Sequence, residues 1–201
     1  HVTLLPFIHA AGELKTKPTQ HSVKELQSVG LQPDILLCRT ERPVPLEQKN
    51  KIGQFCNVAA ADVIIAEDAK SIYQVPLAYH SQGFDTQICR HFNLDEQEPD
   101  LKIWQSISHD FENPEGKITI AIVGKYTSLQ DSYKSLGEAI THGGIANNIK
   151  VKLLRIDSEN LKPSEIKTKL KNISGILIPG GFGKRGTSGK IESIRFARVN
   201  K

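Results

Sequence analysis

Short apolar runs alternate along this chain with segments of helical periodicity. Short, mainly apolar runs, typical of strands, cover residues 2–7, 35–38, 63–66, 117–123, 151–156 and 175–179, and the run 35–38 is continuously apolar. Helical patterns lie between them at residues 23–29, 45–55, 131–145, 163–171 and 189–198, and two short helices are expected within 71–92. Strand–helix alternation of this kind predicts parallel sheets with helices packed on their faces.

The stretch from residue 95 to residue 116 interrupts this alternation. It is acidic and contains two prolines, and its few large apolar residues have the spacing of one short amphipathic helix. We therefore expect a domain over residues 1–94, a linker over 95–116 and a second domain over 117–201. The predicted fold class is α/β, with two doubly wound parallel-sheet domains of Rossmann-like type, both incomplete in this chain.

Composition narrows the class of protein. Hydrophobic residues make up 38% of the 201 positions and charged residues 24%, which is typical of a globular chain. The net charge of +4 and the 6% of aromatic residues give little support to a nucleic-acid-binding domain. No run is long enough for a membrane span. The chain contains no methionine, and both ends look cut.

Three cysteines, Cys38, Cys56 and Cys89, are widely separated and match no zinc or CxxC spacing. Their spacing favours reduced, mostly buried thiols in a cytoplasmic protein.

A polar, cationic segment at residues 12–22 is the first candidate site. Pro18 favours an extended conformation at the residue before it, which would direct Lys15 and Lys17 to one side. Ser22 and Glu25 have the spacing of a capping box, so we expect a helix to begin there. Such a loop before a helix N-terminus suits a polyanion such as a nucleoside triphosphate, although a solvated turn would show the same pattern.

Two further candidates follow predicted strands. Arg39 comes after the apolar run 35–38, and Glu67, Asp68 and Ala69 come after the run 63–66. Ligands of open α/β sheets bind at the carboxyl ends of strands, so these residues could contact a phosphate or carboxylate. A plain surface arginine remains the alternative for Arg39.

The run 175–179 leads into a glycine-rich turn, Gly180-Gly181-Phe182-Gly183. Glycines let backbone N–H groups approach a negative oxygen, so the turn could stabilise an oxyanion or hold a phosphate. Residues 181–186 also fit the dinucleotide string GxGxxG, but the acid expected about 20 residues later is missing. A turn without chemistry is a further reading. No cysteine follows Cys89, and no other nucleophile accompanies the turn.

Several motifs together resemble one family. They are GELKTKPTQHSVKEL at 12–26, QPDI with CR within 32–39, KI with FCNV within 51–58, VGKY at 123–126, DSYKS at 131–135, and PGGFG with RG within 179–186. This chain resembles the CTP synthase family from end to end, and the first motif is highly specific. The resemblance displaces the dinucleotide reading of the glycine turn.

The resemblance implies an amidoligase (synthetase) domain followed by a class I glutamine amidotransferase domain. In such an enzyme ATP, with Mg²⁺, phosphorylates the uracil 4-oxygen of UTP, and ammonia from glutamine displaces the phosphate. GTP activates the glutaminase step, CTP inhibits by feedback, and the enzyme forms a homotetramer. No nucleic acid or membrane partner is implied.

The resemblance also implies site residues. The UTP or CTP phosphates would contact Lys15, Thr16, Lys17, Pro18, Thr19, Gln20 and Lys51. The ATP contacts would be Arg39, Glu67, Asp68 and Ala69. Glutamine would lie against Gly180, Gly181 and Phe182, and GTP would act through a mobile lid at 125–135 that includes Lys134.

The chain departs from the family pattern in what it lacks. The family's phosphate loop, its magnesium-binding acids and its cysteine, histidine and glutamate triad have no counterpart here. We therefore expect no catalytic and no metal-binding residue in this chain and no activity of the chain alone. The alternative reading is an inactive fragment that retains only partial nucleotide-binding or assembly surfaces.

Overall fold

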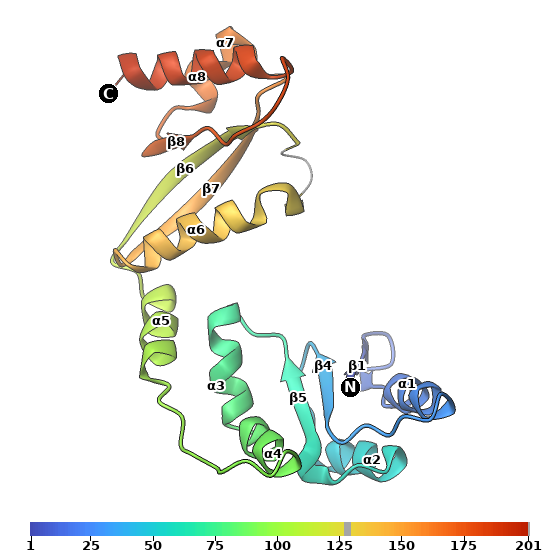
Figure 1. The fold of residues 1–201 in the computed structure, drawn as a ribbon. Helices are drawn as coiled ribbons and strands as arrows, with labels where there is room; N and C mark the ends of the chain where they lie inside the picture. The colour runs from blue at the N-terminus through green and yellow to red at the C-terminus, as the bar shows by residue number, and fades with distance from the viewer. Residues whose placement is uncertain (127–129, 201) are drawn as a thin grey trace. The chain divides into compact units, whose positions relative to one another are not determined.

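The computed structural model describes residues 1–126 and 130–200 (Figure 1). The chain divides into two compact units, His1–Ser108 and His109–Lys201. The division falls within α5 (Lys102–Glu112), the helix that the apolar spacing of residues 95–116 predicts.

The core of unit 1 is a three-stranded parallel sheet in the order β1-β4-β5. Its strands are β1 (Val2–Leu4), β4 (Leu36–Thr40) and β5 (Val63–Glu67), connected by α1 (Lys17–Ser28) and α2 (Leu46–Cys56). Both connections move the chain in the same direction across the sheet. Right-handed crossovers then place both helices on one face. That face carries the core, which consists of Leu5, Val23, Leu36, Cys38, Ile52, Cys56, Val58 and Val63.

The far edge of this sheet is closed by a side chain. After β5 come short helices, η2 (Ile72–Gln74), α3 (Val75–His80) and α4 (Phe84–His91), while η1 (Ala60–Asp62) precedes the strand. The side-chain amide of Gln82, between α3 and α4, accepts from the Ile65 N–H at 2.9 Å and donates to the Ile65 carbonyl at 2.8 Å. It thereby satisfies backbone groups that an edge strand would otherwise expose.

A small antiparallel hairpin, formed by β2 (Phe7–Ile8) and β3 (Glu13–Leu14), follows β1.

Unit 2 has a different winding. Its parallel sheet has the order β7-β6-β8, with β6 (Gly116–Gly124) between β7 (Ile149–Asp157) and β8 (Gly175–Leu177). The chain first moves from β6 to β7 and then crosses back to the other side of β6. The direction therefore reverses between β6 and β8, which is the topological switch point where open α/β sheets bind ligands.

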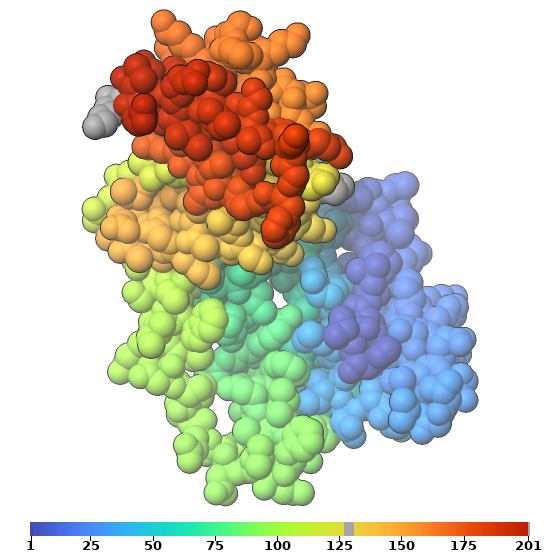
Figure 2. All heavy atoms as spheres, turned by 45° about the horizontal axis from the view of Figure 1, so that its top comes forward, coloured from blue at the N-terminus to red at the C-terminus, as the bar shows by residue number. Residues whose placement is uncertain are grey.

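The reversal places helices on both faces of this sheet (Figure 1). The helix α6 (Lys134–Ile145), preceded by η3 (Gln130–Tyr133), covers one face. It approaches β7 so closely that a Cβ added at Gly144 would lie 2.6 Å from the Ile149 carbonyl oxygen. The helices α7 (Pro163–Lys169) and α8 (Thr187–Val199) cover the other face, where Ile166 and Phe196 pack with Ala121 and Val123. In the space-filling view, α8 (red) lies on the surface of unit 2 (Figure 2).

The parallel α/β prediction is confirmed, and each predicted strand is present with shifted bounds. The predicted start of the first helix is wrong. The helix α1 begins at Lys17, with Pro18 in its first turn, rather than near Ser22. Proline costs no hydrogen bond there, because N–H groups of the first turn have no intrahelical acceptor. Ser22 does not cap the helix, since its hydroxyl lies 2.9 Å from Nε2 of His1.

The cysteines are reduced and mostly buried, as predicted from the sequence. All three are free thiols, with Cys38 and Cys56 buried and Cys89 half-buried. Burial raises the pKa of the Cys38 and Cys56 thiols, so both stay protonated and unreactive at neutral pH. Among the helices of the described residues, none has the length and apolar character needed to cross a membrane.

Candidate functional sites

The polar segment of unit 1 forms the N-terminal turn of α1. Thr16 is the residue before the helix, and its hydroxyl accepts a hydrogen bond from the Gln20 side chain at 3.1 Å instead of capping a backbone N–H. Lys17 is helical, so the extended arrangement that would align it with Lys15 is absent from this segment. The positive end of the helix dipole and its uncapped N–H groups still favour an anion at this turn.

Two of the predicted phosphate-binding lysines share one neighbour. The ammonium of Lys15 donates to the carboxylate of Glu13, at the start of β3. This hydrogen bond, together with the charges of Lys15 and of Lys51 from α2, lowers the pKa of the Glu13 carboxyl. Lys15 and Lys51 come from segments 36 positions apart, and the fold places both within electrostatic reach of one anion.

Thr19, one of the predicted phosphate-binding residues, instead contacts the first strand of the sheet. It is completely buried, and its hydroxyl donates to the Leu4 carbonyl at 3.0 Å and lies 3.1 Å from the Thr3 hydroxyl. These contacts attach α1 to β1. Among residues 15–20, Lys17 and Pro18 are exposed and Lys15 is half-buried, whereas Thr19 is inaccessible to a ligand.

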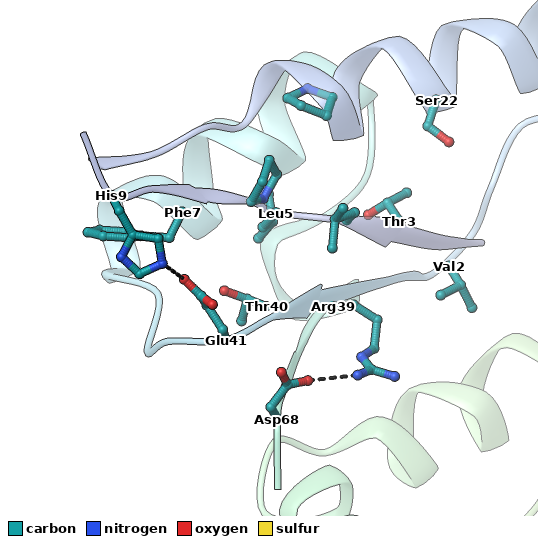
Figure 3. Close-up of a pocket in the computed structure, with 13 residues that line it drawn as sticks. Val2, Thr3, Leu5, Phe7, His9, Ser22, Arg39, Thr40, Glu41 and Asp68 are labelled. Atoms are coloured by element: carbon teal, nitrogen blue, oxygen red, sulfur yellow. Dashed lines mark hydrogen bonds and ion pairs between the residues drawn. The ribbon is translucent and has the colours of Figure 1, made fainter. Parts of the chain in front are cut away.

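The predicted ATP-binding residues lie at the carboxyl end of the sheet of unit 1. Arg39 is inside β4 rather than beyond it, because the strand continues to Thr40. Its guanidinium donates to Oδ1 of Asp68 at 2.7 Å, which links the ends of β4 and β5 (Figure 3). Glu67 is the last residue of β5, and it and Ala69 are exposed on either side of Asp68.

An open hollow of about 810 Å³ lies over this end of the sheet (Figure 3). It is lined by residues of β1 and β4, by Pro18 and Ser22 of α1, and by Arg39 and Asp68. A second polar contact, between Nε2 of His9 and Oε1 of Glu41 at 3.2 Å, lies at the other side of it. The guanidinium of Arg42 stacks on the ring of Phe7 at 3.8 Å, which holds the β2–β3 hairpin against the loop after β4.

Magnesium takes oxygen ligands, usually one or two carboxylates together with waters and the phosphates of a nucleotide. Across residues 1–126 and 130–200, no group of three or more histidine, cysteine, aspartate or glutamate side chains is arranged to hold a metal ion. Asp68, the nearest candidate, is engaged by Arg39.

The second site is the switch point of unit 2. The glycine-rich turn leaves β8, and Gly180, Gly181 and Phe182 are all exposed, Phe182 completely. Within the described part of the chain, none of their three N–H groups donates to a protein acceptor. Free backbone donors at a strand end are what an oxyanion or carboxylate needs.

Two lysine side chains contact the backbone of this turn, and an ion pair follows it. Lys125, directly after β6, donates to the Phe182 carbonyl at 2.7 Å, and Lys190 of α8 donates to the Pro179 carbonyl at 2.8 Å. Arg185 pairs with Glu159 at 2.7 Å, and this hydrogen bond and charge raise the pKa of the guanidinium. The sequence places Lys125 in the predicted lid at 125–135 and gives no role to Lys190, and it predicts neither contact with the turn.

The start of α8 packs against the end of β7. A Cβ added at Gly189 would lie 2.2 Å from the Ser158 carbonyl oxygen, so only glycine fits there. Gly186, at φ +70°, also needs to be glycine, since its added Cβ would lie 2.4 Å from the Ser158 hydroxyl oxygen. The predicted GTP residue Lys134 is exposed at the first position of α6. Part of the predicted lid, residues 127–129, lies outside the described residues.

Comparisons with known proteins cover both units. The family model described as CTP synthase N-terminus matches residues 1–94, and that of class-I glutamine amidotransferases matches residues 128–201. The CTP synthase of Rhodospirillum centenum is 61% identical over 199 residues, which are 98% of this chain and 37% of the relative. Those of Paramagnetospirillum magneticum and Pelagibacter ubique are 59% and 56% identical over the whole chain, which matches 37% and 38% of their lengths. The chain thus spans little more than a third of these relatives.

Proposed function

Because this chain belongs to the CTP synthase family, we propose that it supplies a nucleotide-phosphate site and a glutamine-binding turn to an enzyme that aminates UTP to CTP. In the proposed reaction, glutamine and water give glutamate and ammonia. ATP transfers its γ-phosphoryl group to the 4-oxygen of UTP, and ammonia then displaces this phosphate at C4, giving CTP, ADP and inorganic phosphate.

The observation that carries the proposal is the contact of Lys15 with Glu13 next to the N-terminus of α1, where the charge of Lys51 also acts on the Glu13 carboxyl and helps to lower its pKa. The Glu13 carboxylate accepts from the Lys15 ammonium and lies within the electrostatic influence of Lys51. A triphosphate carries more charge than Glu13 and offers more acceptor oxygens, so it would compete well for both lysines. The helix N-terminus adds further donors for the same anion.

The ATP contact in this proposal is the Arg39–Asp68 pair at the strand ends. Both side chains are more than half exposed, so a phosphate can reach the guanidinium without displacing buried groups. Magnesium would accompany ATP through ligands outside the described residues. Activation by GTP, inhibition by CTP, a homotetramer and a cytoplasmic location remain predictions from the family resemblance.

A chimera tests the phosphate site. Residues 1–201 of this chain replace the matched segment of Rhodospirillum centenum CTP synthase, and CTP formation is measured with ammonia as the nitrogen source. Lys15→Ala and Lys51→Ala should each raise the KM for UTP by about 10-fold to 100-fold, the effect of losing a hydrogen bond to a charged group. Lys24→Ala, an exposed lysine further along α1, is the matched control and should leave the KM unchanged.

An unchanged UTP dependence in both variants would remove the phosphate assignment. The 201-residue chain alone is assayed beside the chimera. We expect it to release no ammonia from glutamine, because no cysteine follows Cys89.

A further inference from the structure

We propose that Lys125 and Lys190 are positioning residues that set the orientation of the glycine turn at the switch point of unit 2. Their ammonium groups hold the carbonyls of Phe182 and Pro179, at the two ends of the segment 180–182. The inference rests on the proposed function, because it assigns the turn the task of donating hydrogen bonds to the glutamine side-chain oxygen.

Peptide geometry connects each lysine to a backbone donor. In a planar trans peptide, the C=O of one residue and the N–H of the next point in opposite directions. Lys190 on the Pro179 carbonyl therefore turns the Gly180 N–H away from itself, and Lys125 on the Phe182 carbonyl does the same for the N–H of Gly183. Both peptide planes flanking the exposed segment are thus fixed by a cation.

Glycine makes such fixation necessary. Gly180, Gly181 and Gly183 lack the Cβ that restricts φ, and Gly183 has φ +78°. Added Cβ atoms at Gly180 and Gly183 would meet nothing within 4 Å, so packing does not hold the turn. Without the lysines, the turn would sample several conformations, and its donors would have to be ordered at the moment of reaction.

The environment of Lys125 indicates more than a surface contact. Its side chain belongs to a residue that is 7% exposed, and no carboxylate of the described residues lies within ion-pair distance of its ammonium. A buried cation without an anionic partner is costly. The charge-assisted bond to the Phe182 carbonyl recovers part of this cost, and it does so only when the turn has the observed orientation.

Attack on the side-chain amide of glutamine places negative charge on the carbonyl oxygen. A donor that is already aimed stabilises this charge without reorganisation, whereas a mobile donor does not. Loss of either lysine should therefore lower the turnover of glutamine more than its binding. The synthetase reaction with free ammonia does not use the turn and should be unaffected.

The chimera described above separates these effects. Lys125→Met keeps the length of the side chain and removes its charge, and it should lower kcat for glutamine hydrolysis by about 10²-fold, with the KM for glutamine changed less than threefold. Lys190→Met should act in the same direction. Lys184→Met is the control and should behave as the parent, because Lys184 is an exposed lysine in the same connection whose ammonium holds no carbonyl of the described residues. All variants should keep the ammonia-dependent formation of CTP.

A second measurement needs only the 201-residue chain. Amide NMR signals of Gly180 and Gly183 should shift and broaden in Lys125→Met and stay unchanged in Lys184→Met, while β6 signals far from position 125 remain unchanged in both. Unaltered glycine signals, or a kcat for glutamine equal to that of the parent, would overturn the positioning role. A rise in KM alone would also overturn it, because it would show a contact that serves binding. A parent chimera that makes no CTP from UTP and ammonia would instead refute the proposed function.

Discussion

Replacing Thr19 by valine tests what attaches α1 to the sheet of unit 1. Thr19 is completely buried, and its hydroxyl is the group that joins the helix to the Leu4 carbonyl and the Thr3 hydroxyl. Valine has nearly the same shape, so Thr19→Val removes the hydrogen bonds without leaving a cavity. The net loss of a buried hydrogen bond with its partner left unsatisfied is about 1–3 kcal/mol of unfolding free energy.

The assay is native-state hydrogen exchange of the 201-residue chain. A loss of about 1–3 kcal/mol should speed the exchange of the most protected amides of α1 and β4 by roughly 5-fold to 150-fold. Amides of β6 should be unaffected, because the hydrogen bonds of the Thr19 hydroxyl to Thr3 and Leu4 both lie within unit 1. Thr86→Val in α4 is the matched control, since the Thr86 hydroxyl has no hydrogen-bond partner among the described residues. Equal exchange rates in parent and Thr19→Val would refute the structural role of this hydroxyl.

Two further predictions concern stability. Gly189→Ala should lower the unfolding free energy of unit 2 by about 1–3 kcal/mol in urea titrations, because its Cβ would overlap the Ser158 carbonyl oxygen; Gly143→Ala, in open space on α6, should instead raise it by about 0.5–1 kcal/mol. The second prediction concerns His80, whose pKa is raised by its hydrogen bond to the Asp85 carboxylate and by the negative charge of that group. The contact therefore stabilises the folded protein fully at a pH below the pKa of an unfolded histidine. This stabilisation is lost as the pH rises through the higher pKa of the folded state. An NMR titration should show a lower His80 pKa in Asp85→Asn, and an unchanged value would contradict the coupling.

Much of the fold follows from patterns that are local in sequence. Runs rich in apolar residues identified every strand of both parallel sheets, because strands of such sheets are covered by helices on both faces. Charged residues occur within β7, at Lys150, Lys152 and Arg155, but its remaining positions are mainly apolar. The start of α1 was missed for an equally local reason. Ser22 and Glu25 have capping-box spacing, but a proline four residues earlier was compatible with an earlier start, and the Ser22 hydroxyl contacts His1 instead. Local signals compete, and tertiary contacts decide between them.

The residues of the candidate sites also differ in whether local sequence patterns or tertiary contacts reveal them. Lys15 and Arg39 could be proposed from the sequence, since one lies in a cationic segment and the other near a strand end. The family resemblance was needed to add Lys51. Neither route indicated Glu13, which contacts Lys15 and whose pKa the charge of Lys51 also lowers. The influence of Lys51 on Glu13 depends on the fold, because the two residues are 38 positions apart in the sequence.

The glycine-rich turn shows why the residues that orient a site could not be predicted from the sequence. Its motif is visible in the sequence, but its orientation depends on Lys125, 57 residues earlier, and on Lys190 in the following helix. Those contacts exist because the chain reverses its winding between β6 and β8, which places the ends of two strands from distant segments side by side. A glycine-rich turn provides donors but not their direction. In this unit the topology provides the direction, by placing a buried cation on the carbonyl side of the turn.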